Sequence, residues 1–262
     1  MKFDIIIPHY GVNDRLTSLC LRCLETIREH SADYRLIFVD NGSPQFEAVL
    51  PEVERHPHLL VRNTRNVGFV KAVNAGIWLS QAEHVVLMNN DTEAVPGWLE
   101  KLAAPLKHMV VLSGPRTTAK MSWQGRTPPG EGFKILPETA MLAFFCTMFR
   151  RDIFDVVGVL DEDFGLGFGD DDHYCWKVQS KGYRLALVED LVIPHHHRSS
   201  FQTLYSREEI SEQQWANYAI FYGKKAHSMS PAEIETVLRN TQEPVVSVLK
   251  AELDRRRIAG VV

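Results

Sequence analysis

Residues 84–100 contain the pattern that decides the fold, HVVLMNNDTEAVPGWLE. The apolar run His84–Met88 has the length of a buried strand, and the polar turn Asn89–Asp91 follows it directly. A Pro-Gly pair then opens a stretch with helical spacing. A strand that passes through a polar turn into a helix is the repeating unit of an α/β sheet.

The same unit recurs towards the N-terminus. Helices are expected from Asp14 to about Glu29, from about Phe46 to Arg55, and from after Gly68 to about Ser80. The strands expected among them are Phe3–Ile7, Leu36–Val39 and Leu59–Val61. Polar residues follow the strands that end at Ile7, Val39 and Met88. Because the carboxyl ends of parallel strands face one crevice, we expect these polar residues to converge on a ligand site.

The second half is less regular. Gly114–Pro137 is rich in Gly and Pro, and we expect it to form a long functional loop. Further helices are expected from Asp170, over about Arg207–Tyr222, and from Pro231 to about Arg257. The further expected strands are Met109–Ser113, Met141–Phe149, Tyr183–Val188 and Val192–His197. The predicted fold class is α/β, with a mostly parallel central sheet and C-terminal helices.

The composition excludes several classes of protein. The chain has 262 residues, 45% hydrophobic and 24% charged, which suits one large domain or one domain with a small appendage. Its 29 Lys and Arg stand against 33 Asp and Glu, so binding of nucleic acid by bulk charge is not expected. No apolar run has the ~20 residues needed to cross a bilayer. No signal peptide is visible, and we therefore expect a cytoplasmic protein.

The cysteines and two of the tryptophans have the pattern of core residues. Cys20 and Cys23 form a C-x-x-C within a helical stretch, and we interpret them as packing residues because no second pair completes a zinc site. Trp98 and Trp176 have helical spacing among apolar neighbours. Trp123, in the irregular segment, is instead a candidate for stacking on an acceptor sugar.

Two strand ends carry candidate ligands. Asp91 lies in a tight polar turn and can bind a hard divalent cation that neutralises a diphosphate; the alternative is a simple turn. Asp40 can accept a hydrogen bond from a ribose hydroxyl or a base N–H. The sequence has no G-x-G-x-x-G after the first strand and no G-x-x-x-x-G-K-[ST]. It therefore lacks the signatures of dinucleotide-binding dehydrogenases and P-loop nucleotidases.

Six segments, taken in order, resemble family 2 of the nucleotide-sugar-dependent glycosyltransferases, including its rhamnosyltransferase-like members. They are IIIPHYG (5–11), VDNGS (39–43), RNTRNVGFVKAVNAGI (62–77), VVLMNNDTEAVPGWLE (85–100), GFGDDDHYCWKVQSKGYRL (167–185) and VIPHHHRSSF (192–201). The resemblance implies a single α/β/α sandwich of the A-type glycosyltransferase fold. In it, residues 1–113 hold the nucleotide sugar and 114–205 receive the acceptor, while 206–262 form a helical appendage.

Position by position, the resemblance implies a donor site. Pro8 and Tyr10 would belong to the first nucleotide loop, and Asp40 would contact the base. The residues that would line the nucleotide and diphosphate are Asn66, Gly68, Lys71, Asn74, Asn89 and Asn90. The implied partner is a nucleotide-diphosphate sugar carrying UDP, dTDP or GDP.

The turn Asn89–Asp91 matches the D-x-D motif of the family with one departure, because the first Asp is Asn89. An amide still hydrogen-bonds ribose but lacks the charge, so metal binding rests chiefly on Asp91. In the histidine run 195–197, His195 fits the family's metal position best and His197 is second. The implied cofactor is a divalent cation, Mn²⁺ or Mg²⁺.

The acidic run Asp170–Asp172 resembles the E-D-x-D segment of the family, whose second acidic residue is the catalytic base. Asp170 and Asp171 match the E-D pair, and His173 replaces the last Asp. We assign the base to Asp171; a shift of one residue would give it to Asp170 or Asp172. Repulsion among three carboxylates should raise at least one pKa. Helix capping is the alternative reason for acidic residues here, and both can hold together.

The sequence thus predicts an inverting, metal-assisted glycosyltransferase that acts on a hydroxyl of a polysaccharide or lipid-linked glycan. Asn89 and His173 keep open a non-catalytic, nucleotide-sugar or glycan-binding subunit of the same fold. A nucleotidyltransferase is disfavoured because the first loop lacks a basic, glycine-rich phosphate cradle. The last helix ends in Arg255–Arg257 and either packs on the protein or contacts an anionic membrane.

Overall fold

The computed structural model describes residues 1–196 and 203–259 and contains one eight-stranded sheet with the order β3-β2-β1-β4-β7-β5-β8-β6. The strands are β1 (Phe3–His9), β2 (Tyr34–Asp40), β3 (His58–Arg62), β4 (His84–Met88), β5 (Val110–Thr117), β6 (Phe133–Ile135), β7 (Cys146–Arg150) and β8 (Arg184–Ile193). The first four strands pair in parallel, as do β5 and β8, whereas β7 and β6 are antiparallel to their neighbours. The predicted α/β class with a mostly parallel sheet is confirmed.

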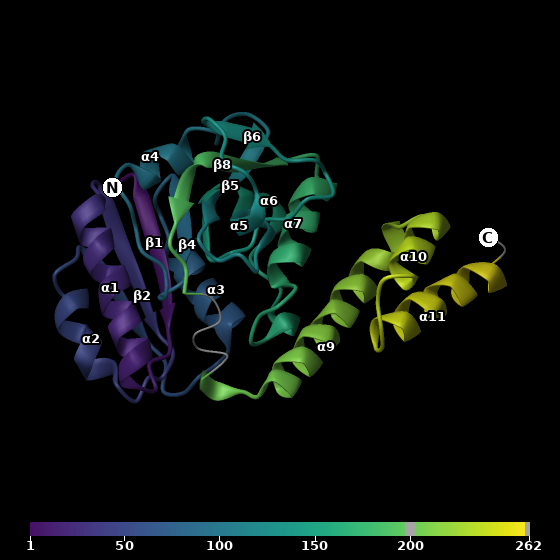
Figure 1. Ribbon diagram of the computed structural model, residues 1–262, viewed down its shortest axis with the longest axis horizontal. Coiled ribbons are helices and arrows are strands. Elements are labelled where there is room, and N and C mark those ends of the chain that lie inside the picture. The colour runs from purple at the N-terminus through teal and green to yellow at the C-terminus, as the bar shows by residue number, and fades with distance from the viewer. Residues whose placement is uncertain (197–202, 260–262) are drawn as a thin grey trace.

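Helices cover both faces of this sheet (Figure 1). They are α1 (Asp14–His30), α2 (Phe46–Val53), α3 (Phe69–Leu79), α4 (Trp98–Ala103), α5 (Trp123–Arg126), α6 (Ile153–Val157) and α7 (Asp170–Ser180), with a 3₁₀ turn η1 (Glu162–Phe164). Successive strand residues point to opposite faces, so Ile5 and Ile7 pack with α1, α2 and α4, whereas Ile6 packs with α3, α6 and α7. This alternation is what makes the molecule an α/β/α sandwich.

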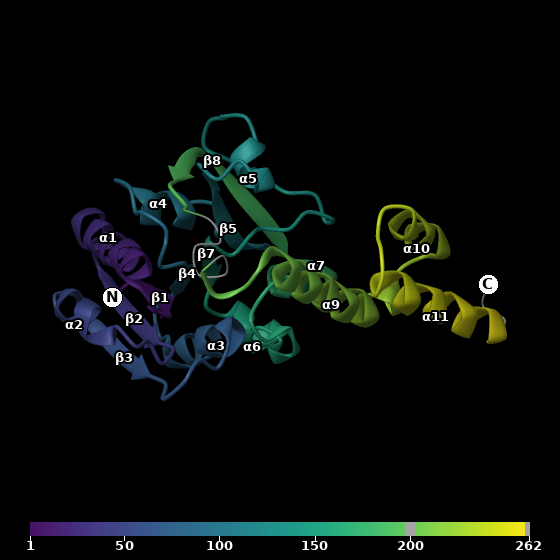
Figure 2. The same ribbon diagram turned by 60° about the horizontal axis from the view of Figure 1, so that its bottom comes forward.

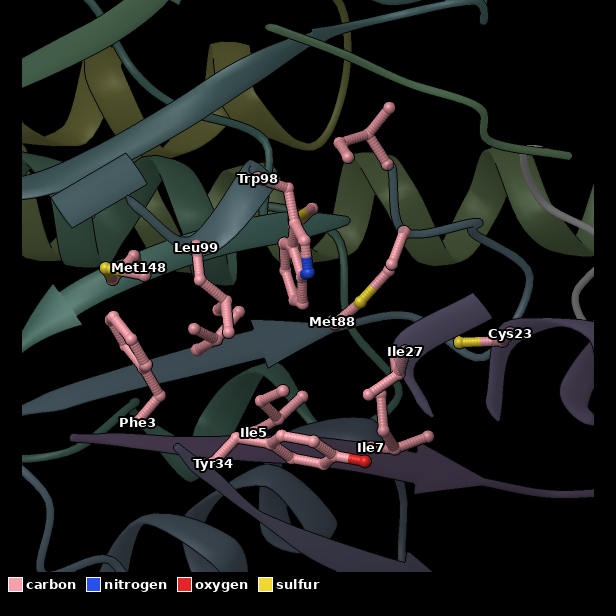
Figure 3. Packing of buried hydrophobic residues seen from close by; sticks show 14 of the residues in the cluster. Phe3, Ile5, Ile7, Cys23, Ile27, Tyr34, Met88, Trp98, Leu99 and Met148 are labelled. Atoms are coloured by element: carbon pink, nitrogen blue, oxygen red, sulfur yellow. The ribbon is translucent and has the colours of Figure 1, made fainter. Parts of the chain in front are cut away.

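The first core cluster contains three side chains that the sequence assigned to packing, of which Trp98 and Cys23 are labelled in Figure 3. Trp98 is fully buried, and its indole Nε1 donates to Ser31 Oγ at 3.0 Å. Cys23 is also fully buried, as is Cys20 on the same helix, and both are free thiols. The interpretation of the C-x-x-C as helix packing is confirmed.

Three expectations for the second half are wrong in detail. The strand expected over Met141–Phe149 begins only at Cys146, and the expected loop Gly114–Pro137 contains the end of β5, helix α5 and strand β6. The two strands expected over Tyr183–Val188 and Val192–His197 are the single strand β8. The pairing of β8 with β5 shifts register between Pro115 and Arg116, so β8 continues through the polar residues in its middle. In the sequence these polar residues look like the end of one strand and the start of another.

The C-terminal helices extend from one side of the sandwich (Figure 1). They are α9 (Arg207–Lys225), the 3₁₀ turn η2 (Ala226–Ser228), α10 (Pro231–Leu238) and α11 (Val245–Ile258). The single helix expected from Pro231 to Arg257 is therefore two helices. Val245 and Leu249 of α11 are fully buried in a small third cluster. No helix among the described residues has the length and apolar character to cross a membrane.

Candidate active site

A cavity of about 470 Å³ lies at the carboxyl ends of the strands. Of the residues predicted for the site, the cavity is lined by Pro8, Tyr10, Asn66, Asn89, Asn90, Asp91, Trp123, Asp170, Asp171 and His195. They come from the end of β1, the segments after β4 and β8, the segment before α3, helix α5, and the first turn of α7. The convergence follows from the parallel arrangement of β1 and β4, whose ends meet at one edge.

Asp40 is fully buried at the end of β2 and does not line the cavity. Its Oδ1 accepts from the backbone N–H of Ser43 at 3.1 Å, and its Oδ2 lies 3.4 Å from Arg62 Nε. The Arg62 guanidinium in turn lies over the Phe46 ring, 4.1 Å from its centre. The Asp40 carboxylate is thus held by Arg62 and by the turn after β2, and its contact with a base stays a prediction.

Three residues predicted on the donor side lie outside the cavity lining. Asn74 is buried, and its amide bonds both the carbonyl oxygen of Leu160 at 2.9 Å and the N–H of Leu160 at 3.1 Å. Lys71 is exposed on α3. Gly68 has φ +92°, and a Cβ there would lie 2.8 Å from the carbonyl oxygen of Gly165. Donor contacts by these residues stay predictions, while Asn74 and Gly68 support the segment before α7. His197 lies outside the described residues.

Asn41 and His9 are among the cavity residues that the sequence did not predict. Asn41 donates to Asn66 Oδ1 at 2.8 Å and accepts from the N–H of Val67 at 3.0 Å, so it fixes the segment before α3. His9 Nδ1 lies 2.8 Å from the Asn90 amide nitrogen, and burial lowers the pKa of His9 to about 4. A neutral His9 can therefore accept from Asn90 at pH 7 and orient its amide. Asn41 and His9 lie at the ends of strands where polar residues gather, and this position in the sequence could have indicated them.

Asp91 and His195 form a buried pair. His195 Nε2 lies 3.2 Å from Asp91 Oδ1, and the His195 ring stacks on Phe145 with centroids 4.9 Å apart. The backbone fixes the pair as well, because the N–H of His196 donates to the carbonyl oxygen of Asp91 at 2.9 Å. The end of β8 is thus tied to the turn after β4.

The three carboxylates of the acidic run open α7 and line the same cavity. Asp170 is 5% exposed, and burial raises its pKa to about 6. Burial and the neighbouring Asp170 and Asp172 raise the pKa of Asp171 well above its usual range. Burial also raises the pKa of Asp172, although the Tyr218 hydroxyl opposes this. The run therefore contains carboxyl groups able to hold or accept a proton near neutral pH.

His173, the departure at the end of the acidic segment, does not line the cavity. Its side chain is buried, with the ring centre 5.1 Å from Phe164 and 5.6 Å from Trp176. Burial lowers the pKa of His173 to about 4, so the ring is neutral at pH 7. His173 is thus a packing residue of α7, whereas Asp170, Asp171 and Asp172 line the cavity.

The donor chemistry of Asp91 and His195 suits a divalent cation. Within residues 1–196 and 203–259, no group of three His, Cys, Asp or Glu side chains is arranged to hold a metal ion. A carboxylate and an imidazole nevertheless suffice where diphosphate oxygens and water complete the coordination sphere. An imidazole ligand favours Mn²⁺ over Mg²⁺.

Known proteins resemble this chain in sequence and in fold. An uncharacterised glycosyltransferase of Bacillus subtilis, YwdF, is 27% identical over 72% of this chain and 71% of its own length. The uncharacterised protein y4gI of Sinorhizobium fredii is also 27% identical, and the chain spans only 24% of that protein. A dolichol-phosphate mannosyltransferase of Pyrococcus furiosus is 26% identical over 41% of this chain and 31% of its own length.

Solved structures share the architecture at low sequence identity. The mannosyltransferase PcManGT of Pyrobaculum calidifontis, in complex with GDP-Man and Mn²⁺, superposes with a TM-score of 0.67 at 18% identity, over 100% of this chain and 76% of its own. S. aureus TarS 1–349 with UDP-GlcNAc gives 0.61 at 16% identity, over 98% and 72%. These likenesses establish the A-type glycosyltransferase fold. Residues 4–158 match the family described as Glycosyl transferase family 2, so the chain belongs to that family.

Proposed function

We propose that this protein transfers a sugar from a nucleotide-diphosphate donor to a carbohydrate hydroxyl with inversion at the anomeric carbon. The observation that carries the proposal is that one cavity brings together the turn Asn89–Asp91 and the acidic run Asp170–Asp172, which lie far apart in the sequence. The first can bind a diphosphate and its cation, and the second can take a proton. Membership of the family supports the same reaction class.

The reaction proposed is a single displacement. The acceptor hydroxyl oxygen attacks the anomeric carbon, the bond from that carbon to the diphosphate breaks, and the nucleoside diphosphate leaves with the bonding electrons. Asp171 takes the proton of the attacking hydroxyl, and its raised pKa makes it a stronger base than an ordinary aspartate. Asp170 precedes it in the first turn of α7, and the charge of the Asp170 carboxylate contributes to the raised pKa of Asp171.

Binding of the donor is assigned to the strand-end residues. Pro8, Tyr10 and Asn66 would surround the nucleotide, and the amides of Asn89 and Asn90 would hydrogen-bond ribose or phosphate oxygens. Asp91 and His195 would hold Mn²⁺ or Mg²⁺, which when bound supplies positive charge beside the diphosphate. The partners proposed are UDP, dTDP or GDP sugars, in line with the nucleotides named for the solved neighbours.

The acceptor is assigned to the part of the cavity bordered by Trp123. Its half-buried indole, at the start of α5, lines the cavity. An aromatic face of this kind stacks on the apolar face of a sugar ring. We therefore propose a glycan acceptor, free or linked to a lipid.

Cytoplasmic location and contact of α11 with an anionic membrane remain part of this proposal. The membrane contact rests on Arg255 and Arg257 alone. The side chain of Arg256 instead donates to the backbone carbonyl oxygens of Met229 and Ala226, both at 2.7 Å. Its charge therefore holds α11 against the loop before α10 rather than facing a lipid surface.

Donor hydrolysis tests the function directly. The protein is incubated with UDP-, GDP- and dTDP-sugars in the presence of Mn²⁺, and release of nucleoside diphosphate is measured. A transferase should release nucleotide from at least one donor, because water can replace the acceptor. Binding of a nucleoside diphosphate without any release would instead support the non-catalytic subunit that Asn89 and His173 suggested.

A further inference from the structure

Helix α9 carries a buried asparagine that contacts the turn before the acidic run. The side chain of Asn217 is 1% exposed. Its Nδ2 donates to the carbonyl oxygens of Phe164 at 2.9 Å and Gly167 at 2.6 Å. Gln213, one helical turn earlier, donates to Asn217 Oδ1 at 2.9 Å. Both polar atoms of the Asn217 amide thus have hydrogen-bond partners, and both hydrogen bonds that it donates end on the turn Phe164–Gly169.

The backbone of that turn is strained. Gly165, Gly167 and Gly169 have φ of +52°, +113° and +77°, and Phe168, which carries a Cβ, has φ +72°. A non-glycine residue keeps such a conformation only where its surroundings impose it. Asn217 of α9 hydrogen-bonds this turn. The N–H of Val70 in α3 also donates to it, at 3.1 Å from the Gly165 carbonyl oxygen.

The turn Phe164–Gly169 fixes the position of the acidic run Asp170–Asp172. It ends at Gly169, the N-cap residue of α7, and Asp170 follows directly. Helix α9 contacts α7 and passes close to one end of it in Figure 1, and the two helices are neighbours in Figure 2 as well. Tyr218, the residue after Asn217, lines the cavity beside the carboxylates, and its hydroxyl interacts with Asp172. Two adjacent residues of α9 thus contact the acidic run or the turn that leads into it.

We propose that Asn217 is a positioning residue that clamps the turn Phe164–Gly169 and thereby holds the carboxylates of Asp170–Asp172 towards the cavity. The catalytic consequence rests on the proposed function, whereas the clamp is a property of the fold alone. The proposal extends the active-site machinery beyond residue 205, into the segment that the sequence assigned to a helical appendage.

The test compares two variants of the full chain. Asn217→Leu keeps the branching of the side chain at Cγ and removes both donors without adding charge. Lys224→Gln is the matched control on the same helix, because Lys224 Nζ pairs with Asp161 at 2.9 Å and Asp163 at 2.7 Å and does not contact the turn. Thermal unfolding and calorimetric titration with UDP, GDP and dTDP measure the folded, binding-competent fraction of each protein.

Hydrogen–deuterium exchange over residues 164–172 reads the clamp without turnover. We expect exchange there to accelerate at least about tenfold in Asn217→Leu and to change less than about twofold in Lys224→Gln. In donor hydrolysis, Asn217→Leu should lower kcat per binding site at least about tenfold and leave the donor KM within about twofold. If the substitution only lowered the fraction of folded protein, the rate per binding site would equal that of the wild type.

The outcomes separate the two proposals. Folded Asn217→Leu with wild-type exchange over 164–172, or with wild-type kcat, overturns the positioning role. A wild-type protein that hydrolyses none of the donors overturns the proposed function, while the exchange comparison still decides the clamp. If Asn217→Leu does not fold, Asn217→Ser removes the amide at a smaller burial cost and is subject to the same two criteria.

Discussion

His195 Nε2 lies 3.2 Å from Asp91 Oδ1, with the two side chains only 6% and 9% exposed. The contact joins the end of β8 to the turn after β4, and a backbone bridge between Thr92 and His195 fixes it. A carboxylate and an imidazole held this way need little further ordering before they bind a cation, which makes the pair the first target for experiment.

Asp91→Ala should abolish metal-stimulated binding of nucleoside diphosphate. The variant loses the anionic oxygen ligand, so binding of UDP, GDP or dTDP with Mn²⁺ should fall at least about tenfold, to the level seen in EDTA. Calorimetric titration measures this. Asp14→Ala, which removes an exposed carboxylate at the start of α1, is the control. Equal affinity of the wild-type protein with and without EDTA would contradict the metal site.

Asp171→Asn should leave donor binding nearly intact and remove transfer. The amide keeps the size of the side chain but takes no proton, and loss of a general base lowers kcat by about 10²–10⁴-fold. Donor titration and nucleotide release, measured on the same preparation, separate binding from chemistry. Full turnover by this variant would move the base to Asp170 or Asp172.

The rate of donor hydrolysis should rise with pH in a range above 3.8, the ordinary pKa of an aspartate, because the pKa of the base Asp171 is raised. The base accepts a proton only when ionised, and burial raises the pKa of Asp170 to about 6 and that of Asp171 well above its usual range. Below this region the pair is protonated, and kcat should fall about tenfold for each pH unit. A kcat profile that stays flat from pH 4.5 to 8 would sink the assignment of these carboxylates.

The free energy of unfolding should fall as pH rises, whereas the rate of donor hydrolysis should increase. The pKa of Asp170 rises from its ordinary 3.8 to about 6 in the folded chain, so folding favours the neutral acid. Its contribution is fully present below pH 3.8 and is lost as pH rises through about 6, an effect of about 3 kcal/mol on the free energy of unfolding. Asp170→Asn stays neutral, so it should unfold at a higher urea concentration than wild type at pH 7. An unchanged difference between the two proteins at pH 4 and pH 7 would refute this.

Gly68→Ala should destabilise the protein by about 1–3 kcal/mol, because φ +92° strains a residue with a Cβ and the new methyl group meets the Gly165 carbonyl oxygen at 2.8 Å. Gly97→Ala is the matched control: φ there is +72°, and nothing lies within 4 Å of the added Cβ. The control should show only the backbone cost, about 1 kcal/mol. Urea unfolding distinguishes them, and equal losses would show that the contact with Gly165 contributes nothing.

The regular part of the fold was predictable because its signals are local. The strand His84–Met88 agrees with β4 residue for residue, and its polar end is where the cavity opens. The strand expected over Met141–Phe149 began too early because the residues before Cys146 are buried against the cavity rather than in the sheet. Burial alone does not distinguish a strand from a packed loop, so an apolar run cannot settle this.

The sequence by itself determined the α/β class, the polar strand ends and the acidic run, since each depends on neighbouring residues and on a period of two or 3.6. Only the tertiary structure decided that His195 meets Asp91, that His173 turns into the core, and that Asn217 of α9 grips the turn before Asp170. These contacts join segments that are distant in the chain. Their geometry is fixed by how β8, α7 and α9 pack together, which no local pattern encodes.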